Sequence, residues 1–294
     1  MSEFDFKKHP FIPLYGDQPI PFFNEEYSKQ RTVYSTDFRG GQLDKQPYIM
    51  PFEVDDPEFI VLICPGGGYF ACANSASADV AIELNRRNIT AFVLSYRTGD
   101  REAPENSYNC HAILQDGVRA MQYVRNYANA RGLADKKIVA LGFSAGGHLA
   151  LTLSLGLSDF NTLHDEIGQL SEIPDAVIAG YPCTTFREGA FPTLSPIFAA
   201  RESDETRNAL DERFTLMHRV DSNTPPTFIY YGTADRAVPP EYNAIPYFFA
   251  LQKAGVKSAI VGYENLGHGI GLAKKTAAEG WLSTAIGWIE QNVL

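Results

Sequence analysis

Cysteine is scarce in this sequence of 294 residues, and this limits the kinds of site that the chain could build. Its four cysteines are widely spaced and form no C-x-x-C pair: Cys64, Cys72, Cys110 and Cys183. A disulfide framework or a zinc site would need cysteines at characteristic close spacings. We therefore expect buried thiols, no metal and no other cofactor.

Positive charge is also in deficit, with 25 lysines and arginines against 35 aspartates and glutamates. The formal net charge of −10 argues against nucleic acid or an anionic membrane as a partner, because both would repel an acidic surface. Long apolar runs are missing as well, since no stretch approaches the length of about 18 apolar residues that a membrane span needs. The first residues also lack the apolar core of a secretory signal, so we expect a cytoplasmic protein.

The residues that are present indicate a globular α/β protein. The hydrophobic content of 45% and the charged content of 20% are ordinary for this class, and the length is enough for one large domain, expected over residues 1–294. Continuous apolar runs predict strands buried on both faces, and amphipathic patterns between them predict helices. The expected strands are 58–64, 90–96, 137–141, 175–181, 226–231 and 258–263, with weaker ones at 32–35 and 48–50, and the expected helices include 75–87, 110–129 and 145–155. Alternation from residue 58 onward predicts a mostly parallel, right-handed, doubly wound sheet with helices on both faces.

Two segments depart from this alternation. Residues 1–30 carry Pro10, Pro13, Pro19 and Pro21, which favours an extended arm lying on the domain over a helix; this arm could equally serve contacts in a homo-oligomer. Residues 183–222 are polar and contain four phenylalanines without strand alternation. We expect a small cap insertion over the carboxyl ends of the strands, with a plain surface excursion as the alternative.

A serine between glycines follows the apolar run 137–141. The sequence Gly142-Phe143-Ser144-Ala145-Gly146 matches the G-x-S-x-G nucleophile elbow, a sharp turn from strand to helix. Small neighbours are needed there because a Cβ at either glycine would collide with the tightly folded backbone. The pattern makes Ser144 a candidate nucleophile, although short matches of this kind also arise by chance in chains rich in small residues.

A serine hydroxyl needs a histidine to accept its proton and an acid to orient that histidine. In this fold the partners follow in the order acid, then histidine, each in a loop after a late strand. His268 lies between glycines after the last expected strand, whereas His148 lies on the helix after Ser144, where packing or hydrogen bonding is the better explanation. Asp235 follows the preceding expected strand and is the candidate acid. The alternative role for Asp235 is that of a residue that only stabilises a turn.

Backbone N–H groups without obstructing side chains are good donors to a tetrahedral oxyanion. Gly66, Gly67 and Gly68 follow a buried strand, and the residue after the nucleophile, Ala145, would supply the second donor. A triple glycine could instead hold a phosphate, but neither G-x-G-x-x-G nor a Walker lysine accompanies it. Tyr69, directly after the glycines, is a candidate substrate contact.

With these motifs the chain resembles an α/β-hydrolase, and it is most similar to the acetyl and feruloyl esterases of xylan breakdown described as xylanase-like esterases. The motifs that carry the resemblance span about residues 58–273; they are Pro65-Gly66-Gly67-Gly68-Tyr69, Gly142 to Ala150, Thr224-Pro225-Pro226-Thr227-Phe228, Ala234-Asp235 with Val238-Pro239, Leu251 to Val256, and Gly267-His268-Gly269. The resemblance implies Ser144 as nucleophile, Asp235 and His268 as its partners, and Gly67 with Ala145 as the oxyanion hole. Two parts depart from the family: the loop after Tyr69 is rich in alanine and serine, and residues 183–222 resemble it little.

The sequence therefore predicts a cofactor-free serine carboxylesterase that acts through an acyl-enzyme. We expect short-chain esters as substrates, with acetyl groups on a carbohydrate or small alcohol as the leading class and an acetylated oligosaccharide among the candidates. An amide or formamide hydrolase, such as an aryl formamidase or a small peptidase, would use the same triad. A binding protein on a hydrolase scaffold would be expected to lack part of the machinery, and all three triad positions are present here.

Overall fold

The computed structural model describes residues 9–30, 47–100, 103–156, 161–187, 190, 198–199 and 202–294. The weak strand expected at residues 32–35 lies outside this part of the chain. The strands are β1 (Ile12–Pro13), β2 (Tyr48–Phe52), β3 (Ile60–Cys64), β4 (Thr90–Ser95), β5 (Ile138–Phe143), β6 (Ala176–Gly180), β7 (Thr227–Gly232) and β8 (Ser258–Tyr263). The helices are α1 (Glu25–Gln30), α2 (Asn74–Asn85), α3 (Cys110–Ala130), α4 (Ala145–Ser154), α6 (Asp204–Arg213), α7 (Ala244–Lys253) and α8 (Trp281–Asn292), with 3-10 turns η1 (Pro104–Asn106), η2 (Ile167–Gln169) and η3 (Leu216–His218).

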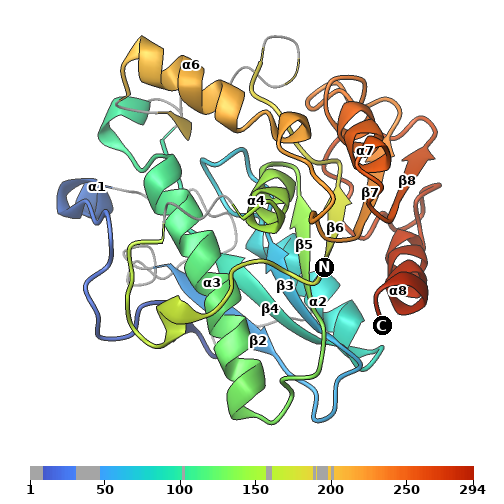
Figure 1. The fold of residues 1–294 in the computed structure, drawn as a ribbon, viewed down its shortest axis with the longest axis horizontal. Helices are drawn as coiled ribbons and strands as arrows, with labels where there is room; N and C mark the ends of the chain where they lie inside the picture. Colours follow the sequence, from blue (N-terminus) through green and yellow to red (C-terminus); the bar gives the residue numbers. More distant parts are fainter. Residues whose placement is uncertain are drawn as a thin grey trace.

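The strands form one eight-stranded sheet in the order β1-β2-β4-β3-β5-β6-β7-β8 (Figure 1). Strands β3 to β8 pair in parallel, whereas β2 pairs with β4, and β1 with β2, in antiparallel fashion. The mostly parallel, doubly wound sheet predicted from the alternation of strands and helices is therefore confirmed. Because parallel strands end at the same edge, the loops after β5, β7 and β8 open on one side of the sheet.

The central strands are apolar along their whole length because both faces of the sheet are covered. Residues of β3 alternate between two cores: Leu62 packs in a cluster with α3, α4 and α7, and its neighbours Val61 and Ile63 pack in a cluster with α2 and α8. Every residue of β3, β5 and β6 is buried. The continuous apolar runs in the sequence thus reflect a layer of helices on each side.

The N-terminal residues lie against the sheet and are more structured than their prolines indicate. Strand β1 extends the sheet, and helix α1 follows the last proline, so the expectation of an arm without a helix is wrong for residues 25–30. The helix begins where the prolines end, because the Asn24 side chain accepts a hydrogen bond from the Tyr27 N–H and two glutamates occupy the first turn.

A buried ion pair holds these N-terminal residues to the sheet. Arg97, after β4, and Asp116, in α3, are joined at 2.7 Å, and both side chains are almost completely buried. The Tyr15 hydroxyl donates to the Asp116 carboxylate at 2.6 Å, and the Arg97 guanidinium also donates to the Pro21 carbonyl. Residues of the N-terminal arm therefore complete the hydrogen bonding of the Arg97–Asp116 pair. Without these bonds, burial of the two charges would cost more desolvation free energy.

The described part of segment 183–222 contains helix α6 and the turn η3, and no strand. Helix α6 starts at the Ser203 cap and has no buried residue, so it lies on the surface. Glu202, before it, contacts His111 at the start of α3. Three phenylalanines of the segment, Phe186, Phe198 and Phe214, are buried, and their rings contact that of His148 in α4.

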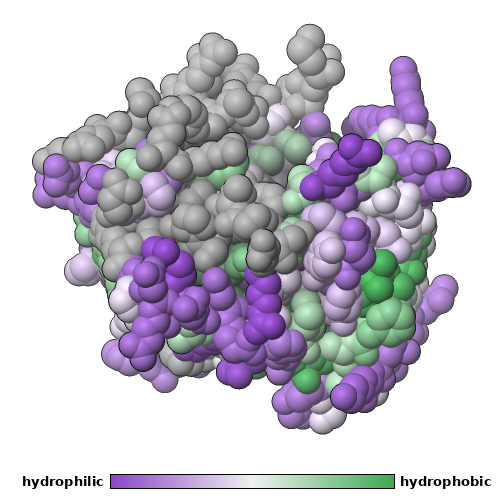
Figure 2. All heavy atoms as spheres, turned by 90° about the horizontal axis from the view of Figure 1, so that it is seen from above, coloured by the Kyte–Doolittle hydropathy of each residue, from purple (hydrophilic) through white to green (hydrophobic). Residues whose placement is uncertain are grey.

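On the face shown in Figure 2, the described residues are largely hydrophilic, and hydrophobic ones gather mainly toward the side that carries the C-terminal elements in Figure 1. Within the described ranges, none of the helices combines the length and the apolarity needed to cross a lipid bilayer.

Candidate active site

The three residues predicted as a triad come from three loops at the carboxyl edge of the sheet. Ser144 follows β5, Asp235 lies in the turn after β7, and His268 lies in the loop after β8. Strands β5 and β7 both flank β6, and β8 flanks β7, so these loops are neighbours in space although His268 is 124 residues from Ser144.

Ser144 has the strained backbone of a nucleophile elbow. Its φ of 54° and ψ of −120° lie outside the ordinary regions for a residue with a side chain, a strain that costs on the order of 1–3 kcal/mol. The close packing around it leaves no space for side chains at the flanking glycines: a Cβ at Gly142 would lie 2.2 Å from the Gly146 oxygen, and one at Gly146 would lie 2.1 Å from the Cys64 oxygen. The requirement for glycine that the sequence pattern predicted therefore has its physical cause in this turn.

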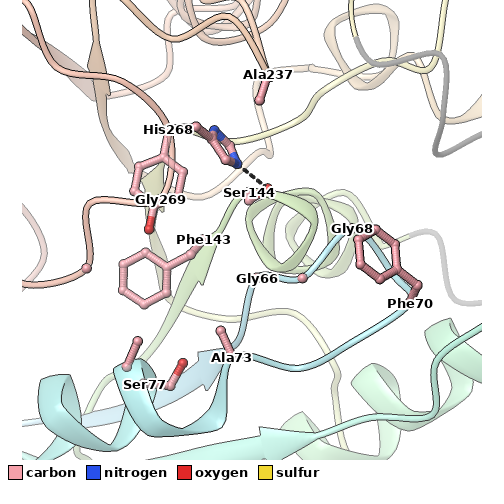
Figure 3. Close-up of a pocket in the computed structure, with 14 residues that line it drawn as sticks. Gly66, Gly68, Phe70, Ala73, Ser77, Phe143, Ser144, Ala237, His268 and Gly269 are labelled. Atoms are coloured by element: carbon pink, nitrogen blue, oxygen red, sulfur yellow. Dashed lines mark hydrogen bonds between the residues drawn. The ribbon is translucent and has the colours of Figure 1, made fainter. Parts of the chain in front are cut away.

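A continuous chain of hydrogen bonds joins the three side chains. His268 Nε2 lies 2.8 Å from Ser144 Oγ, and His268 Nδ1 lies 2.7 Å from Asp235 Oδ2 (Figure 3 shows the first of these). An ionised carboxylate can only accept, so Nδ1 carries the proton and Nε2 is free to accept the serine proton. The structure thus brings the predicted residues together in the order and tautomer that nucleophilic catalysis requires.

Asp235 is fixed by its own backbone environment. Its side chain is fully buried, and Oδ1 accepts hydrogen bonds from the N–H groups of Ala237 and Val238 at 3.0 and 2.9 Å. These bonds satisfy one oxygen while the other faces His268, so the carboxylate is held in one orientation. The turn geometry considered as the alternative role of Asp235 is present, and it serves to orient the carboxylate toward the histidine.

One aromatic residue at the site was not singled out from the sequence. Tyr181 follows β6, and its ring packs edge-on against the His268 ring at a centroid distance of 4.9 Å. This contact restricts the tilt of the imidazole ring. Its position directly after a buried parallel strand was the signal available in the sequence, because such positions lie at the edge where the site forms.

The glycine loop after β3 faces Ser144. Gly66, Gly67 and Gly68 line the same cavity as Ser144, and a Cβ at Gly67 would lie 2.1 Å from the Ala71 oxygen, so only glycine fits there. Among the described residues, no acceptor takes a hydrogen bond from the N–H of Gly67 or of Ala145. Both groups are therefore available to a ligand oxygen, which is what an oxyanion hole needs.

The cavity next to Ser144 has a volume of about 280 Å³ and a mostly apolar lining (Figure 3). It lies between the serine and histidine at one end and the first turn of α2 at the other. Its remaining lining residues are Phe70, Ala73, Ala76, Ser77, Phe143, Tyr181, Ala237, Gly269 and Gly271. This space is large enough for a small acyl group whose carbonyl lies at Ser144, or for a small alcohol group.

Tyr69 does not contact this cavity with its side chain, contrary to the prediction of a substrate contact. The ring is fully buried in the core, and its hydroxyl lies 2.8 Å from His148 Nδ1. Its backbone has a positive φ of 60°, a conformation that the sequence pattern does not reveal.

His148 packs and forms hydrogen bonds in the core, as the sequence indicated. It is fully buried, and its Nε2 lies 3.4 Å from the Phe214 oxygen. Burial lowers the pKa of His148 from 6.5 to about 3, so the ring is neutral at any pH at which the enzyme would work.

The stability of the protein should depend on pH through His148. The pKa of His148 is about 6.5 in the unfolded chain and about 3 in the folded protein. Between these two pH values the unfolded chain binds a proton that the folded protein does not bind. The contribution of neutral His148 to the free energy of unfolding is therefore complete above about pH 6.5 and is lost as the pH falls. We expect the free energy of unfolding to decrease by up to about 1.4 kcal/mol for each pH unit over this range on account of this group. Urea unfolding of the parent and of His148→Asn at several pH values isolates the effect, since the asparagine does not titrate. Equal pH slopes for the two proteins would contradict the assignment.

The four cysteines are unpaired and buried, as expected. Burial raises the pKa of the Cys183 thiol to about 12, which leaves it unreactive at neutral pH. Within the described residues, no three side chains of histidine, cysteine, aspartate or glutamate gather in a way that could hold a metal ion.

Comparison with known proteins supplies the family. A profile of the BD-FAE family matches residues 48–245, which is more than half of the chain and includes Ser144 and Asp235. The chain belongs to the BD-FAE family. The matched region ends before His268, so the structure rather than the family match brings the histidine to the other two residues.

Curated relatives of this BD-FAE chain include larger proteins. An endo-1,4-beta-xylanase B of Butyrivibrio fibrisolvens is 32% identical over 223 residues, and an acetylxylan esterase of Xylanibacter ruminicola is 29% identical over 212 residues. These matches cover 75% and 70% of this chain but only 34% and 40% of the two relatives. The chain thus spans little more than a third of the length of these proteins.

Solved structures confirm the α/β-hydrolase fold of this BD-FAE chain. The acetyl ester-xyloside bifunctional hydrolase of Caldicellulosiruptor lactoaceticus superposes with a TM-score of 0.79 and 28% identity, and the match covers 96% of each chain. The carboxylesterase Cest-2923 of Lactobacillus plantarum is similar in fold, with a TM-score of 0.66 and 23% identity over 85% of this chain and 94% of the other.

Proposed function

We propose that this member of the BD-FAE family is a serine carboxylesterase that removes short acyl groups, foremost acetyl, from a carbohydrate or a small alcohol. The observation that carries the proposal is the hydrogen-bond chain from Ser144 through His268 to Asp235 at 2.8 and 2.7 Å. This chain ends at a serine in an elbow, beside two unused backbone donors and a small apolar cavity.

In the first half of the reaction, Ser144 Oγ attacks the carbonyl carbon of the ester while its proton passes to His268 Nε2. Asp235 stabilises the imidazolium that forms, and the N–H groups of Gly67 and Ala145 donate to the carbonyl oxygen as it gains negative charge. When the tetrahedral intermediate collapses, the bond to the alcohol oxygen breaks. His268 returns the proton to that oxygen, and the acyl group stays on Ser144.

In the second half, water takes the place of the alcohol. His268 Nε2 removes a proton from the water, whose oxygen attacks the acyl carbon, and the same two N–H groups stabilise the second oxyanion. Collapse breaks the bond to Ser144 Oγ, and the proton returns to the serine. The products are one carboxylic acid and one alcohol, and the site is restored without any cofactor.

The names of the relatives support the choice of substrate. An acetylxylan esterase and an acetyl ester-xyloside bifunctional hydrolase are both named for acetyl esters together with a xylan or xyloside, and a third relative is named as a xylanase, which acts on the same polysaccharide. The cavity supports a small group as well, because the space next to Ser144 among the described residues has a volume of only about 280 Å³.

Acyl-chain length tests this proposal directly. We expect kcat/KM for p-nitrophenyl esters to be highest for acetate or propionate and at least about tenfold lower for octanoate, which corresponds to roughly 1.4 kcal/mol of transition-state binding. A long groove would instead make kcat/KM rise with length, since each buried methylene contributes up to about 0.8 kcal/mol. The measurement is a series from acetate to decanoate, each below its aggregation limit, run beside acetylated xylo-oligosaccharides. A maximum at octanoate or longer would contradict the short-chain proposal, and faster cleavage of an N-formyl anilide than of any ester would favour the amide hydrolase.

A further inference from the structure

Tyr69 has an unusual backbone for a residue with a large side chain. Gly67, Gly68 and Tyr69 follow one another with φ values of 135°, 59° and 60°, all in the region that favours glycine. A tyrosine remains in this conformation only when its surroundings fix it, and strain of this kind gathers at functional sites. Two hydrogen bonds hold it: its carbonyl accepts from the Gly99 N–H at 2.7 Å, and its hydroxyl lies 2.8 Å from His148 Nδ1.

The direction of the hydrogen bond between Tyr69 and His148 follows from its neighbours. His148 Nε2 faces the Phe214 carbonyl, which can only accept, so Nε2 carries the proton. The buried ring is neutral, so Nδ1 has a free lone pair and accepts from the Tyr69 hydroxyl. The hydroxyl therefore has one defined role in the core, as a donor to His148.

His148 connects this hydrogen bond to the nucleophile. It lies on α4 one turn beyond Ser144, and its N–H donates to the Ser144 carbonyl at 3.1 Å. The bond from Tyr69 thus ties the loop of Gly67 to the same helix turn that supplies Ser144 and the Ala145 N–H.

Aromatic rings of segment 183–222 enclose the pair. Phe186, Phe198 and Phe214 lie with their centroids 4.7, 5.4 and 5.9 Å from that of His148. The Phe198 ring also stacks on the Tyr69 ring at 5.3 Å. This packing leaves the Tyr69 hydroxyl in a dry environment, in which its bond to His148 is stronger and harder to replace than one exposed to water.

We propose that Tyr69 is a positioning residue, whose hydrogen bond to His148 fixes the Gly67 N–H relative to Ser144 and Ala145. This rests on the proposed function, in which Gly67 and Ala145 stabilise the oxyanion. An oxyanion donor is effective only when it is held where the charge develops. Loss of the tether lets the glycine loop shift, which weakens the interaction with the tetrahedral intermediate more than the interaction with the bound ester.

The test is Tyr69→Phe, which removes only the hydroxyl. We expect kcat for p-nitrophenyl acetate to fall by about 10- to 100-fold while KM changes by less than about threefold. Binding of an alkyl trifluoromethyl ketone, which forms a charged tetrahedral adduct with the serine, should weaken by a similar factor. Active-site titration with an organophosphate corrects every rate for the amount of folded enzyme. The matched control is Tyr230→Phe, since the buried Tyr230 hydroxyl has no hydrogen-bond partner among the described residues and should be dispensable.

A second pair of variants keeps the test decisive if Tyr69→Phe does not fold. His148→Asn retains an acceptor near the position of Nδ1, whereas His148→Leu removes it, so kcat should be lower in the leucine variant than in the asparagine variant. Parental kcat and parental ketone affinity in folded Tyr69→Phe, or equal kcat values for the two His148 variants, would overturn the proposal. If Ser144→Ala abolishes turnover but the Tyr69 and His148 variants keep the parental kcat, the positioning role of Tyr69 is wrong and the proposed function stands. If Ser144→Ala retains turnover, the proposed function itself is wrong.

Discussion

Ser144→Ala is expected to reduce kcat on p-nitrophenyl acetate by a factor on the order of 10³ to 10⁶ while the protein stays folded. Alanine removes the oxygen that attacks the ester, and the remaining rate comes from substrate binding and from the Gly67 and Ala145 donors alone. The fold should persist because the Ser144 backbone, rather than its hydroxyl, forms the bonds to Gly180, His148 and Cys183. Steady-state turnover and thermal unfolding of the purified variant provide the measurement.

Ser154→Ala is the matched control for this substitution. Ser154 lies on the same helix as His148, is buried like Ser144, and has its hydroxyl near the Leu151 carbonyl and the Tyr247 side chain, away from the triad. Its loss should leave kcat close to that of the parent. Turnover near the parental value in folded Ser144→Ala would show that another group attacks the ester.

Asp235→Asn is expected to reduce kcat by a factor on the order of 10⁴ with little change in the structure. The asparagine oxygen can still accept from Ala237 and Val238, as Asp235 Oδ1 does. Its amide group would then face His268 Nδ1 and donate to it, so that the proton moves to Nε2 and the ring can no longer accept from Ser144. Both kcat and kcat/KM should fall together, because the lost interaction belongs to the transition state.

A loop aspartate of the same local type serves as the control. Asp221 also accepts from the backbone N–H two residues along the chain, but it lies away from the three strand ends that form the site. Asp221→Asn should retain the parental kcat. A loss at Asp235→Asn that is no larger than the loss at Asp221→Asn would remove Asp235 from the proposed triad.

Features set by local chain geometry were predictable from the sequence. The run Ile60–Cys64 is apolar throughout because helices cover both faces, and the elbow requires glycines because backbone atoms lie about 2 Å from where a Cβ would be. The positions of Ser144, Asp235 and His268 followed from the rule that loops after parallel strands meet at one edge. In each case a few adjacent residues carry the information.

Features that depend on how distant segments pack were not predictable. The direction of the Tyr69 side chain depends on a backbone conformation with positive φ and on contacts with distant residues such as Gly99 and His148, the latter 79 residues away. The role of Tyr181 beside His268 depends on two strand ends that are neighbours only in the folded sheet. Helix α1 was missed because its start depends on a single asparagine cap after a segment rich in proline.

The central claim is that an acyl group passes through Ser144 Oγ, and covalent trapping tests it most directly. The parent protein is treated with diethyl p-nitrophenyl phosphate, activity is followed, and the modified peptide is identified by mass spectrometry. We expect loss of activity in proportion to the label, with about one phosphoryl group per chain, attached to Ser144. Complete inactivation with the label on another residue, or full activity with Ser144 labelled, would contradict the account.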